Sequence, residues 1–245
     1  MFIRYCLVLV ALIVAAVPAS AQDFPNRTIH IVVAYAPGGT GDIVARLIAA
    51  PLAEALGQNI VIENRAGATG AIGTQAVVSA PPDGHTLLMG QTGEIAINQH
   101  WIKGLTYNAE KDLMPIALAS VVPLALVVPA KAPYSTMAEL AKALAEKQPL
   151  TFASAGTGTP GHFAGEFLKL RTKATLTHVP YKGAGPALND LLGSHVDMYF
   201  PGFPAATPLL KGGQVKSSRC PRPSAPAARP ACRPSPRRSA IRTST

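Results

Sequence analysis

The stretch "VAYAPGGTGDIVAR", residues 33–46, decides the fold, because its three glycines join a β-branched run to a segment of helical periodicity. A strand that turns on glycine into a helix is the repeating unit of an α/β sheet. Glycine lets the backbone approach a ligand closely, and the first N–H groups of a helix attract anions. The stretch therefore predicts an α/β fold, and it leaves open a phosphate, a carboxylate or no ligand at this turn.

Strand and helix patterns alternate beyond this loop and continue to residue 216. In the first part we expect strands at 29–34, 59–63 and 86–90 and helices at 41–56 and 70–79, the first helix ending at Gly57. This β-α-β-α-β order predicts a parallel sheet with right-handed crossovers. We assign it to a first α/β domain over residues 22–105.

A second α/β domain is expected over residues 106–216. Residues 113–130 are apolar but contain Pro115, Pro123 and Pro129, which favours strands over a helix. Thr136 and Glu139 have the capping-box spacing at the start of a helix over 136–147. Strands are then expected at 150–154, 175–180 and 196–200, and helices at 160–171, 184–192 and 203–211. Ligands bind beyond the carboxyl ends of such strands, so two facing sheets predict a shared cleft.

Residues 1–21 have the pattern of a secretory signal peptide. A basic start is followed by an apolar run and by small residues, which predicts cleavage after Ala21 and export to the periplasm. The run is shorter than the roughly 20 residues that a membrane-spanning helix needs. Residues 22–216 contain no cysteine, which excludes disulfides and thiolate metal sites from the body of the protein.

The net charge of +9 is concentrated in residues 217–245, which hold seven arginines and no acid. The remainder has 15 Lys and Arg against 13 Asp and Glu, so a nucleic-acid partner is not indicated. The tail is rich in Arg, Pro, Ser and Ala and too poor in larger apolar residues to form a core, so we expect it to be disordered. A basic arm for a polyanion is one interpretation; we favour a coding region read out of frame.

Three loops share the order of strand end, glycines and helix start, at residues 36–42, 64–70 and 154–162. The third contains Gly156-x-Gly158-x-x-Gly161, a formal match to the dinucleotide fingerprint. A dinucleotide-dependent oxidoreductase is therefore the alternative function. The following strand runs into "THVPYKG", however, and supplies no acidic residue for a ribose.

The chain has no phosphate-binding P-loop motif, no nucleophile elbow and no histidine pair at metal-binding spacing. We therefore expect no catalytic residue, no metal ligand and no cofactor. For each of two loop residues, Asp42 and His162, the sequence allows two roles. Asp42 either stabilises the start of its helix or contacts a ligand, and Arg46 lies one turn on, where it can pair with Asp42. His162 either donates to a bound carboxylate or fills an ordinary surface or core position.

The stretch from Phe24 to Gly90, together with "SAGTGTPGHFAGEFLK" (154–169) and "VPYKGAGPALNDLLGSHVDMYF" (179–200), resembles the Bug-type receptors. These are the periplasmic substrate-binding proteins of tripartite tricarboxylate transporters. The resemblance covers residues 24–216 and implies a two-domain, Venus-flytrap-like periplasmic binding protein of type II, with its ligand cleft between the domains. In that family the chain returns to the first domain after the strand at 212–216. In this sequence the Arg/Pro-rich tail takes the place of that returning segment, so the resemblance implies an incomplete first domain.

The resemblance also implies a site, carried over position by position. One wall is formed by Tyr35, Pro37, Gly38, Gly39 and Asp42, with Thr69 and Thr92 as further contacts, and the other by Ser154, Gly156, Thr157, Gly158 and His162. The ligand is a small carboxylate: a di- or tricarboxylate, an acidic amino acid or an aromatic acid. The implied protein is a monomeric receptor without enzymatic activity that delivers this ligand to membrane permease subunits.

Overall fold

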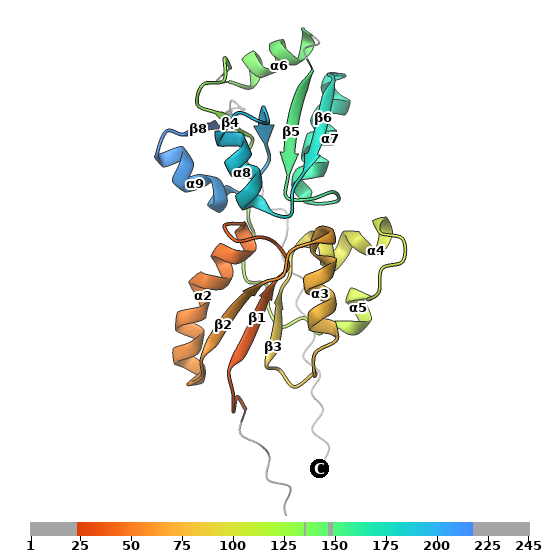
Figure 1. The fold of residues 1–245 in the computed structure, drawn as a ribbon, viewed down its shortest axis with the longest axis vertical. Coiled ribbons are helices and arrows are strands. Elements are labelled where there is room, and N and C mark those ends of the chain that lie inside the picture. The colour runs from red at the N-terminus through yellow and green to blue at the C-terminus, as the bar shows by residue number, and fades with distance from the viewer. Residues whose placement is uncertain (1–23, 135, 147–148, 218–245) are drawn as a thin grey trace, which may run out of the picture.

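The computed structural model describes residues 24–134, 136–146 and 149–217, which form two α/β lobes stacked along the long axis (Figure 1). The first lobe comprises residues 24–112 and is built on a three-stranded sheet; the second comprises residues 127–217 and is built on a five-stranded sheet. The expected signal peptide and most of the expected tail lie outside the described residues. The two sheets confirm the predicted α/β class.

The first lobe is the predicted parallel sheet, with strand order β2-β1-β3. Its strands are β1 (Ile29–Val33), β2 (Ile60–Asn64) and β3 (Thr86–Met89), and its main helices are α2 (Thr40–Leu56) and α3 (Ala71–Val78), the latter preceded by the 3-10 turn η1 (Ala68–Gly70). α2 ends at Gly57, whose φ of 64° is left-handed, as the sequence predicts. β1 is the central strand, and Ile31 and Val33 pack with Ala45 of α2 to form the core.

The second lobe has the strand order β6-β5-β7-β4-β8. Its elements are β4 (Val127–Pro129), α6 (Met137–Ala145), β5 (Leu150–Ser154), α7 (Pro160–Thr172), β6 (Leu176–Pro180), α8 (Ala184–Leu192), β7 (Met198–Tyr199), α9 (Phe203–Lys211) and β8 (Val215–Ser217). β5 is parallel to β6 and β7, whereas β4 runs antiparallel to β7 and β8. The predicted capping box at Thr136 and Glu139 is present.

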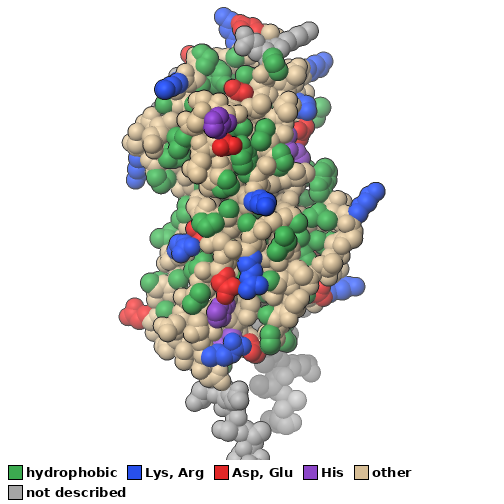
Figure 2. All heavy atoms as spheres, in the orientation of Figure 1, with side chains coloured by type: hydrophobic (Ala, Val, Ile, Leu, Met, Phe, Trp, Pro, Cys, Tyr) green, Lys and Arg blue, Asp and Glu red, His purple; other side chains and the backbone are tan. Residues whose placement is uncertain are grey.

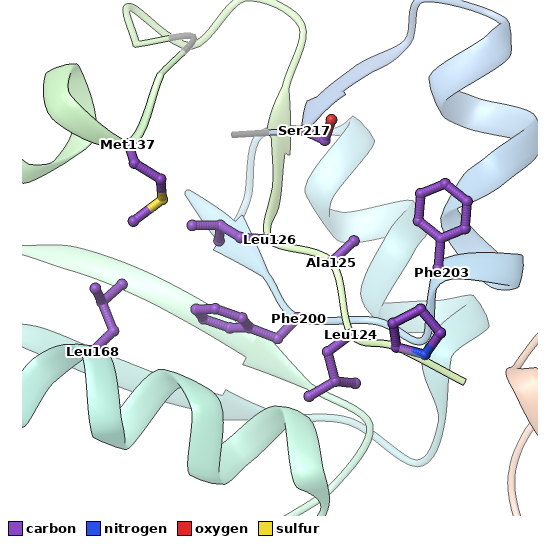
Figure 3. Close-up of a pocket in the computed structure, with 9 residues that line it drawn as sticks. Leu124, Ala125, Leu126, Met137, Leu168, Phe200, Phe203 and Ser217 are labelled. Atoms are coloured by element: carbon purple, nitrogen blue, oxygen red, sulfur yellow. The ribbon is translucent and has the colours of Figure 1, made fainter. Parts of the chain in front are cut away.

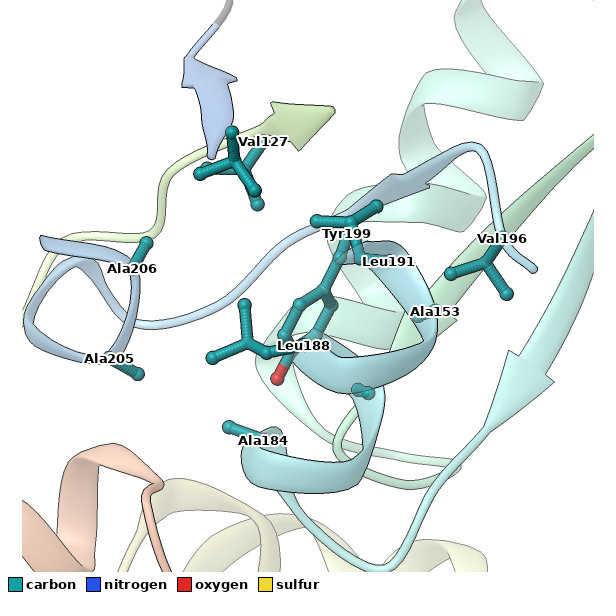
Figure 4. Close-up of a cluster of buried hydrophobic side chains, with 11 residues drawn as sticks. Val127, Ala153, Ala184, Leu188, Leu191, Val196, Tyr199, Ala205 and Ala206 are labelled. Carbon is teal, nitrogen blue, oxygen red and sulfur yellow. The ribbon is translucent and has the colours of Figure 1, made fainter. Parts of the chain in front are cut away.

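A buried cluster joins the second sheet to helices α8 and α9 (Figure 4). Tyr199 lies at its centre with Leu188 and Leu191, and all three side chains are buried. Ile43 of α2 packs against the same cluster. The first lobe therefore contributes a side chain to the core of the second, which fixes the start of α2 at the boundary between the lobes.

The segment that connects the lobes differs from the prediction. Strands were expected over 113–130, but only Val127–Pro129 forms one, and Leu124 adds an isolated bridge to Gly202. The expected strand at 196–200 is likewise reduced to Met198–Tyr199. Each proline removes a donor from a strand ladder, and within the described residues no strand pairs with 113–123; the carbonyl oxygen of Pro123 accepts from the N–H of Phe203 over 2.9 Å. Apolar side chains on this segment are consequently exposed, led by Met114 at 87% and Val121 at 83%.

Residues 91–112 form three short helical segments that the sequence did not predict. They are the π-helical turn η2 (Gly93–Ile97), α4 (Asn98–Trp101) and α5 (Ala109–Asp112). Acidic and basic side chains are interspersed over the face of both lobes in Figure 2, in line with the near balance of charge before the tail. Within the described part of the chain, no helix has both the length and the hydropathy needed to cross a bilayer.

Candidate functional site

The carboxyl ends of β1 and β5 point toward each other across the boundary between the lobes (Figure 1). The loop after β1 leads into α2, and the loop after β5 leads into α7. Neither helix has a side chain that caps its first N–H groups: the N-cap residues are Gly39 and Thr159, and neither side chain accepts a cap hydrogen bond. Such free N–H groups are suited to bind anions. We call this region the lobe junction.

The loop at 36–39 meets the loop at 182–185 of the second lobe. The Ala36 N–H donates to the carbonyl oxygen of Lys182 over 3.0 Å. Gly183 has a φ of 155°, and a Cβ there would lie 2.7 Å from the backbone nitrogen of Ala36. The close approach of the two loops therefore requires glycine at position 183. Gly39 lies against Ala184 in the same contact, and Pro37 and Gly38 are exposed beside it.

A second contact joins the loop at 67–70 to the loop at 155–159. The Thr69 hydroxyl donates to the carbonyl oxygen of Thr157 over 2.8 Å, between Gly156 and Gly158. Trp101 of α4 lies beside this contact, with its ring 6.4 Å from that of His162 and 6.5 Å from that of Phe163. The predicted walls thus meet in two places. Thr69 faces Thr157, whereas 36–39 faces 182–185 rather than the loop of Ser154.

Asp42 is 4% exposed, and hydrogen bonds engage both of its carboxylate oxygens. Oδ2 accepts from the N–H of Gly38 over 3.0 Å, and Oδ1 accepts from Nε of Arg46 over 3.0 Å. Burial alone would raise the pKa of Asp42, but the Arg46 guanidinium and the Gly38 N–H outweigh it and lower the pKa. The predicted pairing with Arg46 is present. The carboxylate shapes the glycine loop and does not cap the helix at its N-cap position.

His162 and Ser154 are also engaged inside the second loop. Nδ1 of His162 accepts from the N–H of Gly158 over 3.1 Å, which leaves the proton of the neutral ring on Nε2. The Ser154 hydroxyl is fully buried; it accepts from the N–H of Gly156 over 3.1 Å and lies 2.7 Å from Nε2 of His178. Burial lowers the pKa of His162. Burial also lowers the pKa of His178, to about 4, and the neighbouring His162 adds to this shift. Both side chains therefore stabilise the loop.

An acid that was not among the predicted site residues lies beneath the first wall. Glu94 is 1% exposed; its Oε1 accepts from the N–H of Gln91 over 2.7 Å and its Oε2 accepts from the Tyr35 hydroxyl over 2.8 Å. Its position three residues after Gln91, at the start of a helical turn, is the spacing at which an acid reaches back to a backbone N–H. Thr92 is exposed, and its side chain caps no helix.

An apolar cavity of about 440 Å³ lies in the second lobe, away from the junction loops (Figure 3). Leu126, Met137, Leu168 and Phe200 face one another across it, and Ser217 lies at its edge. Its lining carries no charged side chain. Among the described residues, no group of three His, Cys, Asp or Glu is placed to hold a metal ion.

Two α/β lobes that meet at the carboxyl ends of their strands define the fold of the periplasmic binding proteins. Residues 44–231 match the tripartite tricarboxylate transporter family receptor, and the match extends into the Arg/Pro-rich tail. The chain therefore belongs to this family and is a Bug-type receptor, as the resemblance implies.

Relatives support this assignment in sequence and in structure. Protein BugT of Bordetella pertussis is 36% identical over 204 residues, which cover 82% of this chain and 63% of BugT. Rhodopseudomonas palustris Rpa4515, solved with adipate, is 35% identical with a TM-score of 0.78, and MatC of the same organism, solved with bound malate, is 37% identical with a TM-score of 0.73. The matches cover 80% and 79% of this chain. The chain spans 66% of each of these two structures, less than two-thirds of their length.

Proposed function

We propose that this chain is a periplasmic solute receptor that holds a small dicarboxylate at the lobe junction and delivers it to a tripartite membrane transporter. The observation that carries the proposal is the pair of uncapped helix starts, α2 and α7, each behind a glycine loop that contacts the opposite lobe at the junction. These helices are 17 and 13 residues long, and each directs N–H groups and the positive end of its dipole to its first turn. Two such donors suit the two ends of a dicarboxylate.

The proposed ligand contacts come from backbone groups more than from side chains. The side chains of Asp42, Ser154 and His162 are engaged within their own loops, so they hold the backbone in the shape that a ligand meets. Gly38, Gly39, Gly156, Thr157 and Gly158 are the proposed contact positions. The N–H groups of Gly38, Gly156 and Gly158 already donate to these side chains, so the proposed donors to the ligand are the first-turn N–H groups of α2 and α7. Ordered water can bridge such groups to a carboxylate at little entropic cost.

Relatives narrow the ligand class. Adipate and malate, found with two relatives of known structure, are both small dicarboxylic acids. We propose the same class here, held without chemical conversion, in a receptor of two domains that meet at the junction. Export through the signal peptide to the periplasm, and association with permease subunits, belong to the same proposal.

The dinucleotide alternative receives no support from the region that follows Gly161. The next strand, β6, ends at Pro180, and Tyr181 and Lys182 follow, so no carboxylate is available there for a ribose hydroxyl. The Lys182 ammonium has no acceptor atom, and the Tyr181 phenol is a weaker acceptor than the carboxylate that holds the ribose hydroxyl in this motif.

Thermal denaturation of the full chain with malate, adipate or NAD tests the proposal. A ligand at a hundred times its Kd stabilises the folded state by about 2.7 kcal/mol, and this raises the Tm of a protein of this size by roughly 5–10 °C. We expect such a rise with at least one dicarboxylate and none with NAD. A rise with NAD alone would contradict the receptor function.

A further inference from the structure

Glu94 is a buried acid that the proposed function leaves without a role. Its carboxylate lies against the Tyr35 hydroxyl, and two glycines make room for the pair. A Cβ on Gly70 would lie 3.1 Å from Oε2 of Glu94, and a Cβ on Gly93 would lie 2.9 Å from the Tyr35 hydroxyl oxygen. Any larger residue at these glycines would push the pair apart. The contact between phenol and acid is therefore built into the backbone around it.

The Tyr35 hydroxyl has two acceptors and one proton. It lies 2.8 Å from Oε2 of Glu94 and 3.3 Å from the carbonyl oxygen of Thr69. When Glu94 is ionised, its carboxylate is the stronger acceptor and receives the hydrogen bond from the Tyr35 hydroxyl. When Glu94 is protonated, its own O–H can donate to the phenol oxygen, and the phenol proton is free to turn to Thr69.

Thr69 connects the hydrogen bonding of the Tyr35 hydroxyl to the second lobe. Its φ of 53° and ψ of 45° are left-handed, as is the φ of 44° at Ala68, and this conformation is strained for residues with a side chain. Its carbonyl oxygen also accepts from Nδ2 of Asn98 over 2.9 Å. Hydrogen bonds to this carbonyl hold the strained turn, and the turn aims the Thr69 hydroxyl at Thr157.

We propose that Glu94 acts through Tyr35 as a positioning residue for lobe closure: protonation of Glu94 releases the Tyr35 hydroxyl to the Thr69 carbonyl and strengthens the hydrogen bond from Thr69 to Thr157. This role concerns the closure of the lobes and needs no particular ligand. It therefore stands or fails separately from the proposed dicarboxylate.

The surroundings of Glu94 place its titration in the neutral range. Burial raises its pKa to about 7, against the opposing hydrogen bonds from the Gln91 N–H and the Tyr35 hydroxyl. The phenol of Tyr107 also faces this turn, donating to the backbone oxygen of Glu94 over 2.8 Å. Burial raises the pKa of both phenols, so both stay neutral through this range.

The other charged groups near this turn are exposed to water. α4 carries His100, and α5 carries Glu110, Lys111 and Asp112, all on the surface. η1 contributes Thr69 and Gly70, which carry no charge. Solvent screens the exposed charges, so protonation of Glu94 is the event expected to change the turn near pH 7.

The fluorescence of Trp101 reports on this contact directly. It is the single tryptophan of the chain, and its ring lies against His162 and Phe163 of the opposite lobe. We would record its emission from the full chain, without ligand, between pH 5.5 and pH 8.5, about 1.5 pH units on either side of the expected midpoint. The wild-type protein is expected to show a transition centred near pH 7, where Glu94 titrates.

Two variants separate Glu94 from other titrating groups. Glu94→Gln keeps the shape, and its amide can donate to the Tyr35 oxygen at every pH, so the transition is lost and the low-pH emission persists. Tyr35→Phe removes the shared proton and also abolishes the transition. The signal of His162 is retained in both variants and lies at lower pH, since burial lowers the pKa of His162.

Circular dichroism of each variant shows whether it folds. If Glu94→Gln does not fold, Tyr35→Phe decides, and the reverse holds as well. Should both variants fail to fold, the wild-type emission alone tests the proposal: a transition near pH 7 supports it. A wild-type protein without that transition, or a folded variant that keeps it unchanged, overturns the proposal.

Discussion

The Thr69 hydroxyl of the first lobe donates to the Thr157 carbonyl of the second lobe over 2.8 Å, and these two residues are 88 positions apart in the chain. Both lie in glycine-flanked turns that the sequence alone marks as loops. Their contact joins the two halves of the proposed site, so its loss is expected to weaken ligand binding without unfolding either lobe.

Thr69→Val removes this hydrogen bond and keeps the β-branched shape. One neutral hydrogen bond contributes about 1 kcal/mol, so the Kd for a bound dicarboxylate is expected to rise about fivefold. Thr69→Ser keeps the hydroxyl and serves as the matched control, with a Kd close to wild type. Calorimetric titration of both variants measures the difference, and equal affinities for Val and Ser would contradict the role of the hydroxyl.

Gly183→Ala is expected to keep the two junction loops apart, because its Cβ would lie 2.7 Å from the Ala36 nitrogen. Gly57→Ala is the matched control: Gly57 has a φ of 64° but no atom within 4 Å of the added Cβ. Both changes should lower the free energy of unfolding, by about 1 kcal/mol for the control. Only Gly183→Ala should also weaken ligand binding, with a Kd that rises tenfold or more, which corresponds to about 1.4 kcal/mol. Urea denaturation and calorimetric titration together separate the two effects.

Asp42→Ala leaves the Gly38 N–H without its acceptor and should destabilise the protein by about 1–3 kcal/mol at pH 7. The pKa of Asp42 is lower in the folded protein than its ordinary value of 3.8. Its contribution is therefore present above that value and is lost as the pH falls through the lower folded pKa. Urea denaturation of wild type and variant at pH 7 and at pH 3 should show the difference shrinking in acid. If the difference in unfolding free energy between wild type and variant were as large at pH 3 as at pH 7, the negative charge of Asp42 would not be the source of the stabilisation.

His178 is expected to make the folded state sensitive to mild acid. Its pKa falls from an ordinary 6.5 to about 4 on folding, so the unfolded chain binds a proton that the folded chain does not. Stability should therefore decline as the pH falls from 6.5 toward 4. His178→Gln can still hydrogen-bond near Ser154 but cannot titrate, and its Tm should vary less over this range. A Tm profile with the wild-type slope would contradict this assignment.

Most of the α/β elements could be predicted from the sequence because local signals define them. Gly57 ends α2 and Thr136 caps α6 through contacts with residues a few positions away. The connecting segment could not be predicted, since a strand also needs a partner. Residues such as Met114 and Val121 have strand-like composition, yet they are exposed and unpaired in the described structure.

The candidate site was predictable as a set of loops but not as a set of contacts. Glycines and helix starts identify the loops at 36–42 and 154–162. Their partners depend on how the lobes meet: Ala36 contacts Lys182, which no local pattern indicates. Glu94 was missed for a similar reason, because its partner Tyr35 lies in the loop after β1, 59 residues away.

The most direct test of the central claim is calorimetric titration of malate and adipate into the full chain, with Gly183→Ala in parallel. We expect one-to-one binding of at least one of these dicarboxylates to the wild type, and binding to the variant that is weaker by tenfold or more, about 1.4 kcal/mol. Wild-type protein that is folded by circular dichroism and binds neither acid, or a variant that binds as tightly as wild type, would contradict a carboxylate site at the lobe junction.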